Sequence, residues 1–187
     1  MPVSGRGHDS CSLSSGPAGW RLDGNLWLER GQGVLRLAYR VLCDSRWTTR
    51  AVHLDLEWAG ARRALQLTAD NLGHWWVAGE VRSELSGCHD VDLNLSPATN
   101  TLPIRRLNLA AGDSQDIHVV WLRLPDLTMT RSAQSYRRVA DDAYLFRNLD
   151  NGFEALLKVD GDGLVTDYPG GWALAPPPAR DPRSAVS

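Results

Sequence analysis

The chain has 187 residues, with 20 lysines and arginines against 22 aspartates and glutamates and a net charge of −2. This length fits one domain, or two small halves that share one core. The nearly balanced charge argues against a protein that binds nucleic acid or a membrane surface through bulk charge. Lys158 is the only lysine, and the excess of arginine has two open readings: a GC-rich genome, or guanidinium groups that bind fixed carboxylate, phosphate or carbonyl partners.

The cysteines and the start of the chain bear on the cellular compartment. Cys11, Cys43 and Cys88 are odd in number and lack CxxC spacing, which favours a reducing compartment over a disulfide framework. Residues 1–19 contain no apolar stretch of the kind found in secretory signals. No apolar run approaches the roughly 18 to 20 residues of a membrane-spanning helix. We therefore expect a cytoplasmic protein.

Composition predicts a tail at each end of the chain. Residues 1–17 are rich in Gly and Ser, and we expect a flexible N-terminal tail there. Residues 174–187 are rich in Pro and predict a flexible C-terminal tail. Residues 18–173 are then the folded domain.

Between the tails, apolar side chains alternate with polar ones, which is the pattern of half-buried β-strands. Leu35 to Val41 is the first such segment, and Val52 to Trp58 is the clearest in the chain. Leu65 to Leu67 continues the pattern, Asp70 to Gly73 predicts a turn, and Trp75 to Val81 is the next strand candidate.

The second half of the domain has the same order of strands and turns. Its expected strands are 117–124, 127–130, 144–147, 153–159 and 164–168, with turns at 125–126, 148–152 and 160–163. Residues 131–140 are the only helix candidate. An offset of about 88 to 90 residues relates the two halves, which indicates either an internal duplication or turn chemistry that all-β proteins share.

Many short strands separated by turns predict an all-β fold with little helix. The expected architecture is a single antiparallel domain, as a sandwich, a roll or a barrel.

Several charged side chains fall on apolar faces of the expected strands. Arg50 shares the face of Val52 and Leu54, and on an expected strand over residues 104–109 Arg105 shares the face of Leu107 and Leu109. Arg106 lies on the opposite face, with Ile104 and Asn108. Because an unpaired buried charge is very costly, these arginines either form ion pairs or contact a ligand. Asp90 and Asp92 share one face and could supply the partners.

Eight tryptophans are a high number for this length. Indoles in an all-β protein fill core volume, and they also line grooves for sugar rings or acyl chains. We expect Trp58 and Trp121 in the core and Trp47, which has polar neighbours, at the mouth of a cavity. Trp75 and Trp76 point to opposite faces of their strand.

No sequence motif requires catalysis or a metal. The histidines are scattered, and HxxxH, HExxH and paired CxxC spacings are absent. The cluster from Cys88 to Asp92 could bind a metal or hold a nucleophile, but neighbouring side chains on a strand diverge. Asp160 to Gly163 predicts a turn, because the later ligands of a calcium loop are missing. Walker A, GxGxxG and GxSxG motifs are also absent.

One long segment carries a resemblance to a known family. Asp90 to Leu107 reads DVDLNLSPATNTLPIRRL and resembles the bacterial family of putative glycolipid-binding proteins, formerly a domain of unknown function. Other family motifs match at Tyr39 to Val41, Cys43-Asp44, Arg46 to Arg50, Asp70 to Trp75, Gln134 to Arg137 and Val159 to Trp172. The resemblance covers roughly residues 18–173. Ala98 is a departure, since the family pattern has a bulkier, often aromatic residue there.

The resemblance implies a spiral β-roll built from two similar halves, with an apolar cavity and a polar mouth. It implies a non-catalytic protein that needs no cofactor and binds a glycolipid or another acylated small molecule. The expected ligand-binding residues are Arg50, Arg105 and Arg106 at the head group, with Asn100, Trp47 and Tyr136 at the rim.

Three alternatives stay open. The chain could be a hydrolase of a sugar or lipid ester, with Asp90, Asp92 or His89 as acid and base. It could be an interaction module whose open sheet edge pairs with a partner protein. The segment Cys88 to Leu109 could also be a structural clasp between the two halves.

Overall fold

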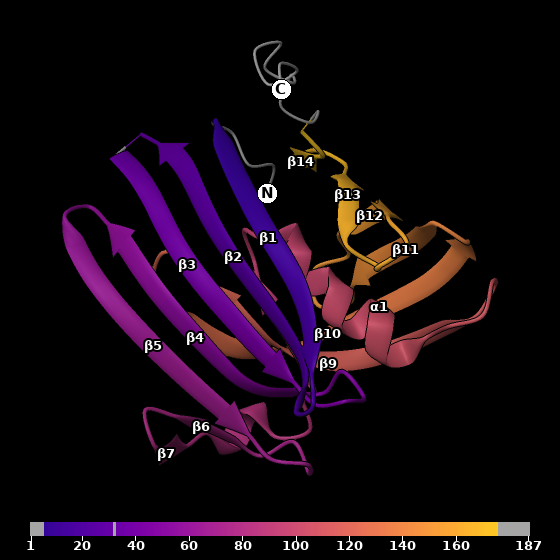
Figure 1. The fold of residues 1–187 in the computed structure, drawn as a ribbon, viewed down its shortest axis with the longest axis horizontal. Coiled ribbons are helices and arrows are strands. Elements are labelled where there is room, and N and C mark those ends of the chain that lie inside the picture. Colours follow the sequence, from indigo (N-terminus) through magenta and orange to yellow (C-terminus); the bar gives the residue numbers. More distant parts are fainter. Residues whose placement is uncertain (1–5, 32, 176–187) are drawn as a thin grey trace, which may run out of the picture.

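The computed structural model describes residues 6–31 and 33–175, and within them the chain forms two seven-stranded sheets. The first sheet contains β1 (Gly7–Gly16), β2 (Gly19–Arg30), β3 (Gly33–Cys43), β4 (Thr49–Trp58), β5 (Ala61–Ala69), β6 (Trp75–Val77) and β7 (Glu80–Val81). The second contains β8 (Asp90–Leu93), β9 (Ser114–Arg123), β10 (Thr128–Ala140), β11 (Ala143–Asn148), β12 (Glu154–Val159), β13 (Val165–Tyr168) and β14 (Trp172–Ala173). In both sheets, each strand is hydrogen-bonded to the strands of that sheet that come directly before and after it in the chain (Figure 1). The prediction of an all-β fold with two similar halves is confirmed.

The strands of the first sheet form because their apolar side chains recur with period two. Leu35, Leu37, Tyr39 and Val41 of β3 are all buried, and the residues between them are exposed. The antiparallel register places Leu37 opposite Leu56 of β4. One face of this sheet is therefore a continuous apolar surface that has to be covered.

The second sheet covers this surface and is buried on both of its own faces near β9. Val120 packs in the core shared with the first sheet, whereas its neighbour Val119 packs in a second core. The second core also contains Ile104 of the short helix α1 (Thr101–Leu107). Figure 1 shows α1 lying against the curled C-terminal sheet. The molecule thus has three layers: the first sheet, the second sheet and α1.

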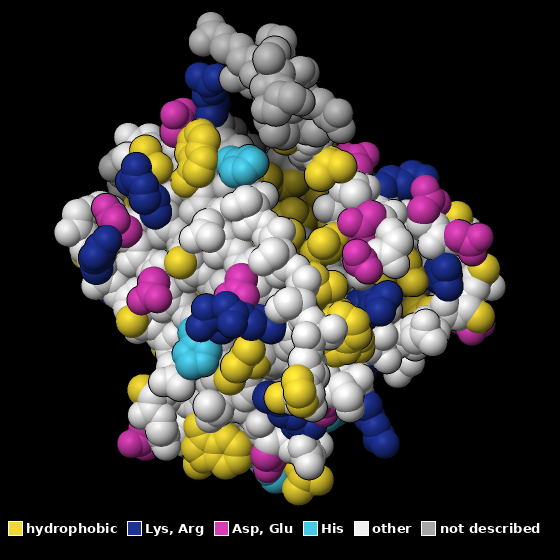
Figure 2. Space-filling view, in the orientation of Figure 1, with side chains coloured by type: hydrophobic (Ala, Val, Ile, Leu, Met, Phe, Trp, Pro, Cys, Tyr) yellow, Lys and Arg dark blue, Asp and Glu magenta, His cyan; other side chains and the backbone are white. Residues whose placement is uncertain are grey.

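Apolar side chains also join β1 to the C-terminal strands. Leu13, Leu164 and Trp172 are partly buried and pack against the core of the first sheet. Figure 2 shows hydrophobic side chains along this seam.

The expected strand over residues 104–109 is wrong, because Thr101–Leu107 is a helix. This helix, α1, follows the short 3-10 helix η2 (Pro97–Asn100). Pro103 lies in the first turn of α1, where a missing N–H is tolerated. Asn108 ends the helix in a left-handed conformation with φ 44°. A short apolar run fits the two-residue period of a strand as well as the 3.6-residue period of a helix, so the pattern alone could not distinguish them. Arg105 and Arg106 consequently lie on neighbouring sides of a helix, and not on opposite faces of a strand.

Three further expectations need correction. Residues 131–140 are strand, since β10 pairs with β9 on one side and β11 on the other. Trp75 to Val81 is a tight hairpin of β6 and β7, followed by the short 3-10 helix η1 (Ser83–Leu85). The sheets are not wholly antiparallel, because β8 and β9 are parallel.

The flexible N-terminal tail is also wrong for residues 7–16, which form β1 and pair with β2 along its whole length. Asp9 anchors the strand, because it accepts hydrogen bonds from the Tyr39 hydroxyl at 3.0 Å and the Ser96 hydroxyl at 2.5 Å. Composition indicated flexibility, but a Gly- and Ser-rich segment can still pair through its backbone. The tails expected over residues 1–5 and 176–187 lie outside the described residues.

Candidate functional site

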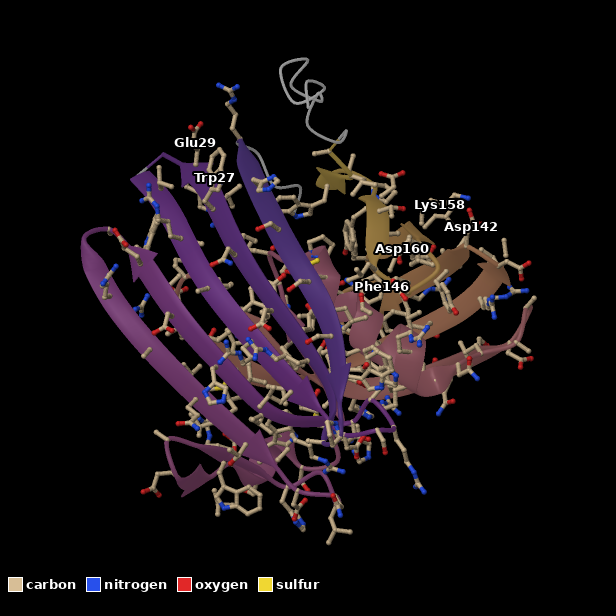
Figure 3. All side chains as sticks on the ribbon, viewed as in Figure 1. Trp27, Glu29, Asp142, Phe146, Lys158 and Asp160 are labelled. Atoms are coloured by element: carbon tan, nitrogen blue, oxygen red, sulfur yellow. The ribbon has the colours of Figure 1, made fainter. Side chains whose placement is uncertain are left out.

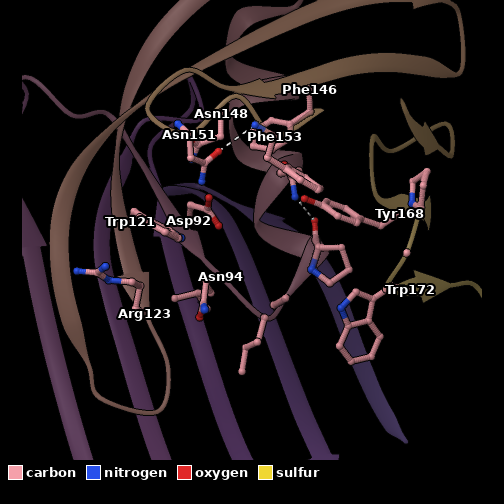
Figure 4. Close-up of a pocket in the computed structure, with 18 of the residues that line it drawn as sticks. Asp92, Asn94, Trp121, Arg123, Phe146, Asn148, Asn151, Phe153, Tyr168 and Trp172 are labelled. Carbon is pink, nitrogen blue, oxygen red and sulfur yellow. Dashed lines mark hydrogen bonds between the residues drawn. The ribbon is translucent and has the colours of Figure 1, made fainter. Parts of the chain in front are cut away.

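A pocket of about 440 Å³, which we call the aromatic pocket, opens beside the second sheet and the segment that follows β8. Among the described residues its aromatic lining consists of Trp121, Phe146, Phe153, Tyr168 and Trp172. Its polar lining includes Arg30, Asp92, Asn94, Ser96, Asn100, Arg123, Asn148 and Asn151. Figure 4 shows the rings and the amide groups around one space. The pocket therefore offers both flat apolar surfaces and hydrogen-bonding groups.

Three rings of neighbouring elements form one wall of the aromatic pocket. Phe146 comes from β11, Phe153 follows the turn between β11 and β12, and Tyr168 ends β13. The Phe153 and Tyr168 rings are nearly parallel, at 10° and 6.3 Å between centroids. Phe146 lies 6.3 Å from Phe153. Each ring is held by its neighbour, so the wall is formed before any ligand binds.

A chain of hydrogen bonds behind the pocket fixes two of its polar groups. Gln134 Nε2 donates to Asp92 Oδ2 at 2.6 Å. The Tyr136 hydroxyl donates to Asn100 Oδ1 at 2.8 Å and also lies 3.3 Å from Gln134 Oε1. Asn100 Nδ2 in turn donates to the Pro97 carbonyl. Asp92 and Asn100 are thus oriented by a buried network, which reduces the cost of ordering them on binding.

Burial controls the charge of Asp92. It raises the pKa of this carboxyl to about 6, and the hydrogen bond from Gln134 opposes the shift. At neutral pH the pocket therefore holds a carboxylate whose surroundings are poorly solvating. Such a group gains from accepting hydrogen bonds from ligand hydroxyls.

A second hollow of about 580 Å³ lies at the other end of α1, and we call it the arginine pocket. Its charged lining consists of Arg46, Arg105, Arg106, Arg138, Asp141 and Asp160. The remaining lining consists of Ser45, Trp47, Ile104, Asn108, Tyr144, Val159, Gly161 and Gly163. The sequence led us to expect an apolar cavity close to Arg105, and this hollow is instead mostly polar.

Trp47 reaches the arginine pocket from a turn whose pattern occurs three times among the described residues. In each turn an aspartate carboxylate accepts two backbone N–H groups, and the aspartate carbonyl accepts the N–H three residues later. The three turns start at Asp44, Asp70 and Asp160. Their fourth residues have positive φ and are Gly73, Gly163 and, in the first turn, Trp47 with φ 68°. A bulky side chain in this conformation is strained.

The guanidinium group of Arg105 lies over Trp47, 5.1 Å from its ring centroid, and 5.8 Å from that of Trp20. The two indoles stack on each other at 4.4 Å. On the other side, a Cβ atom at Gly163 would lie 3.1 Å from Arg105 Cδ. Arg105 is thus held between the first and third of these turns.

Arg106 is committed to an ion pair. Its Nε and Nη2 donate to the Asp90 carboxylate at 3.0 and 2.6 Å, and the Asp90 side chain is fully buried. Burial raises the pKa of Asp90, although the guanidinium group opposes the shift. Asp90 and Asp92 do share a face of β8, but Asp90 bonds Arg106 and Asp92 bonds Gln134.

Arg50 is also paired, and it is not among the residues that line either pocket. Leu42 opposes Ala51 and Cys43 opposes Thr49, so a β-bulge leaves Arg50 as an extra residue in β4. Its side chain therefore does not continue the face of Val52, as alternation predicted, and its Nη2 donates to Asp44 Oδ2 at 2.5 Å.

The six expected ligand-binding residues therefore divide into three groups. Trp47, Arg105 and Arg106 line the arginine pocket, and Asn100 lines the aromatic pocket. Tyr136 is buried behind Asn100, and Arg50 is bound to Asp44. The single polar mouth expected from the sequence does not form, because α1 separates the ends of the segment that carries these residues.

Sequence reasoning missed most of the aromatic pocket. Phe146, Phe153 and Tyr168 were assigned to strands, Trp172 was named only as the end of a family motif, and Trp121 was expected in the core. One signal was available: Tyr144, Phe146 and Asn148 share a face of β11, so an amide continues an apolar face. The other contributors come from separate strands, and their convergence has no local signal.

The part of the chain that the structure describes contains neither a metal-binding cluster nor a membrane-spanning helix. No group of three or more His, Cys, Asp or Glu side chains there could hold a metal ion. None of the helices in residues 6–31 and 33–175 has the length and apolarity needed to span a bilayer.

Comparison with known proteins identifies relatives of the chain. A family model described as "Putative glycolipid-binding" matches residues 1–173. The crystal structure of a DUF1089 family protein from Pseudomonas aeruginosa is similar, with a TM-score of 0.85 and 33% sequence identity over 94% of this chain and 95% of that one. Comparison with curated proteins gave no match.

Proposed function

Because the chain belongs to the putative glycolipid-binding family, we propose that it binds a glycolipid without changing it chemically, with the sugar in the aromatic pocket. Its volume of about 440 Å³ falls within the usual range of small-molecule sites. A cytoplasmic location stays a prediction from the sequence.

The observation that carries the proposal is the combined lining of the aromatic pocket. A sugar ring has apolar C–H faces, which pack against aromatic rings, and hydroxyl groups that need both donors and acceptors. Tyr168 and Trp172 offer such rings, and Asp92, Asn100 and Asn148 offer such groups. The lining therefore suits a sugar.

The acyl part of the ligand would lie outside the pocket. Leu149 and Phe153, at the turn that borders it, are 41% and 38% exposed. Covering such apolar side chains with lipid stabilises a complex by roughly 0.8 kcal/mol for each CH₂ group removed from water. This arrangement replaces the apolar cavity with a polar mouth that the family resemblance implied.

The hydrolase alternative is less well supported. Glycoside hydrolysis commonly uses two carboxyl groups that flank the bond. Asp92 is the one carboxylate in the described lining of the aromatic pocket, while Asp90 is bound to Arg106. A buried carboxylate with a raised pKa can hold a hydroxyl group without cleaving anything.

Native mass spectrometry of the freshly purified chain tests the proposal. We expect a co-purifying species whose released mass contains both a hexose and acyl chains. Release of a lipid without sugar would contradict the proposal. A protein that shows only its unliganded mass after purified glycolipid is added would contradict it as well. Detection of a free sugar and a free lipid as products would support the hydrolase instead.

A matched pair of variants locates the site. Phe153→Ala removes a ring of the aromatic pocket, and Trp27→Ala removes an equally exposed ring, 39% against 38%, outside it. Figure 3 shows Trp27 near the end of β2, far from Phe146. We expect Phe153→Ala to weaken glycolipid binding by about tenfold and Trp27→Ala to leave it unchanged. Equal effects of the two would place the sugar elsewhere.

A further inference from the structure

We propose that the arginine pocket is a second binding site, separate from the sugar site, and that its ligand is a phosphate monoester. The proposal rests on the charge, the geometry and the backbone strain of its lining.

The charge of the arginine pocket differs from that of the chain. The chain has a net charge of −2, whereas four arginines and two aspartates of the described residues line this hollow. Asp90 pairs with Arg106 from outside the lining. Arg46 and Arg105 form no salt bridge with a described residue, and no described group accepts a hydrogen bond from either guanidinium. Counting Asp90, Asp141 and Asp160 against the four arginines leaves one net positive charge, and the guanidinium groups of Arg46 and Arg105 line this space without a carboxylate partner among the described residues.

The geometry of Arg105 leaves its hydrogen-bond donors available. Its Cζ atom lies 5.1 Å from the ring centroid of Trp47 and 5.8 Å from that of Trp20, so the guanidinium group lies beside the stacked pair of indoles. An indole ring has no conventional hydrogen-bond acceptor, so these contacts leave the N–H groups of the guanidinium available to a ligand. Planar, oriented N–H pairs match two oxygens of a phosphate group. Packing against the indoles also reduces the conformational entropy that Arg105 loses on binding.

A third arginine adds a fixed positive charge. Arg138 donates to the carbonyl groups of Leu109 and Asp141 at 3.0 and 3.1 Å. Carbonyl groups orient the guanidinium without neutralising it. The Asp141 carboxylate lies 3.5 Å away but is 99% exposed, so solvent screens it. Arg138 thus contributes to the positive potential at a constant position.

The backbone conformation of Trp47 supports the site independently of its charges and hydrogen-bond donors. Two turns of the same pattern have glycine at the left-handed position, and the turn beside Arg105 has a tryptophan there. Such a conformation costs on the order of 1 kcal/mol or more. Strain of this kind persists where the surrounding structure holds the residue in place, often at a functional site, and here the strained residue packs against Arg105.

Titration of the whole chain with inorganic phosphate tests the proposal, at constant ionic strength with chloride as the replaced anion. The signals to follow are the Trp47 indole and the Arg105 Nε–H in ¹H–¹⁵N spectra, assigned with Trp47→Phe and Arg105→Gln. We expect saturable shifts of both signals. We also expect Arg105→Gln and the exposed Arg46→Gln each to weaken binding by about tenfold.

Arg123→Gln is the matched control, because Arg123 also lies 5.1 Å from a tryptophan ring centroid, that of Trp121, but outside the arginine pocket. It should leave phosphate affinity unchanged. Equal weakening by Arg123→Gln and Arg105→Gln, or shifts that follow chloride as they follow phosphate, overturn the proposal and leave the arginines with a structural role at the end of α1.

Two further arms identify the source of the phosphate group. Glycerol 3-phosphate in solution represents a soluble ester, and phosphatidylcholine vesicles with and without phosphatidic acid represent a lipid head group. Binding of either through Arg105 supports the site and identifies its ligand; binding of neither overturns it. These probes contain no sugar, so the aromatic pocket can fail its own test while this site passes, and the reverse.

Discussion

Trp47 and Gly163 occupy the same left-handed position in two turns of one hydrogen-bonding pattern, one turn from each sheet. The Arg105 side chain lies between them: its Cζ atom is 5.1 Å from the indole centroid, and a Cβ atom at Gly163 would lie 3.1 Å from its Cδ atom. The two halves of the fold therefore meet at an arginine of α1, which neither half contains within its strands.

Gly163→Ala should disturb Arg105 as well as the turn. Alanine with φ near +80° costs about 1 kcal/mol, and its Cβ would lie 3.1 Å from Arg105 Cδ. Gly152→Ala is the control, with φ 72° and nothing within 4 Å of the added Cβ. In urea unfolding we expect both variants to lose about 1 kcal/mol. Only Gly163→Ala should shift the Trp47 indole N–H signal in ¹H–¹⁵N spectra. An unchanged signal would show that the position of Arg105 does not depend on the absence of a Cβ atom at residue 163.

Removal of Arg106 should be severe, because it leaves the Asp90 carboxylate buried without a partner. We expect Arg106→Ala to lower the free energy of unfolding by about 3–5 kcal/mol. The double variant Asp90→Leu/Arg106→Met should lose less, since it removes both charges and keeps the volume.

The control for this pair is Arg147→Ala, whose partner Glu154 is 43% exposed. It should cost less than about 1 kcal/mol. Urea midpoints of the three variants measure the difference. A loss for Arg106→Ala as small as that for Arg147→Ala is incompatible with a desolvated pair.

Asp92 should make stability depend on pH. Because burial raises its pKa from 3.8 to about 6, the folded state favours the neutral carboxyl. The stabilisation from this group is complete below about pH 4 and is lost as the pH rises to about 6. Asp92→Asn lacks this loss. We expect its free energy of unfolding, relative to the unaltered chain, to rise by on the order of 2 kcal/mol between pH 4 and 7; a difference that does not change with pH would contradict the assignment.

β1 should behave as part of the sheet. Hydrogen–deuterium exchange of a peptide covering residues 7–16 should be slow, because this strand pairs with β2 throughout. Asp9→Ala removes the acceptor of the Tyr39 and Ser96 hydroxyl groups and should speed exchange of this peptide more than exchange in β4. If the peptide of residues 7–16 in the unsubstituted chain exchanged as fast as an unstructured peptide, the flexible tail expected from composition would be correct and the β1 pairing wrong.

Local patterns were sufficient for the strands that are half buried. Leu35 to Val41 and Val52 to Trp58 were predicted because alternation is a property of each strand alone and does not depend on its partner. The turns at Asp70 and Asp160 were predicted for a similar reason, since Asp and Gly suit them by their own conformational preferences. Arg50 escaped this reasoning, because a bulge depends on how two strands are joined.

The sequence by itself determined an all-β chain of two similar halves, its main turns and its family. Only the tertiary structure decided that Ile104 to Leu107 is helical. The apolar pattern of this run fits a strand and a helix equally, and it is the helix that brings Arg106 to the buried Asp90. The aromatic pocket was likewise decided by the fold. Its rings come from strands far apart in the chain, and only the curl of the second sheet brings Trp121 and Trp172 to the same space.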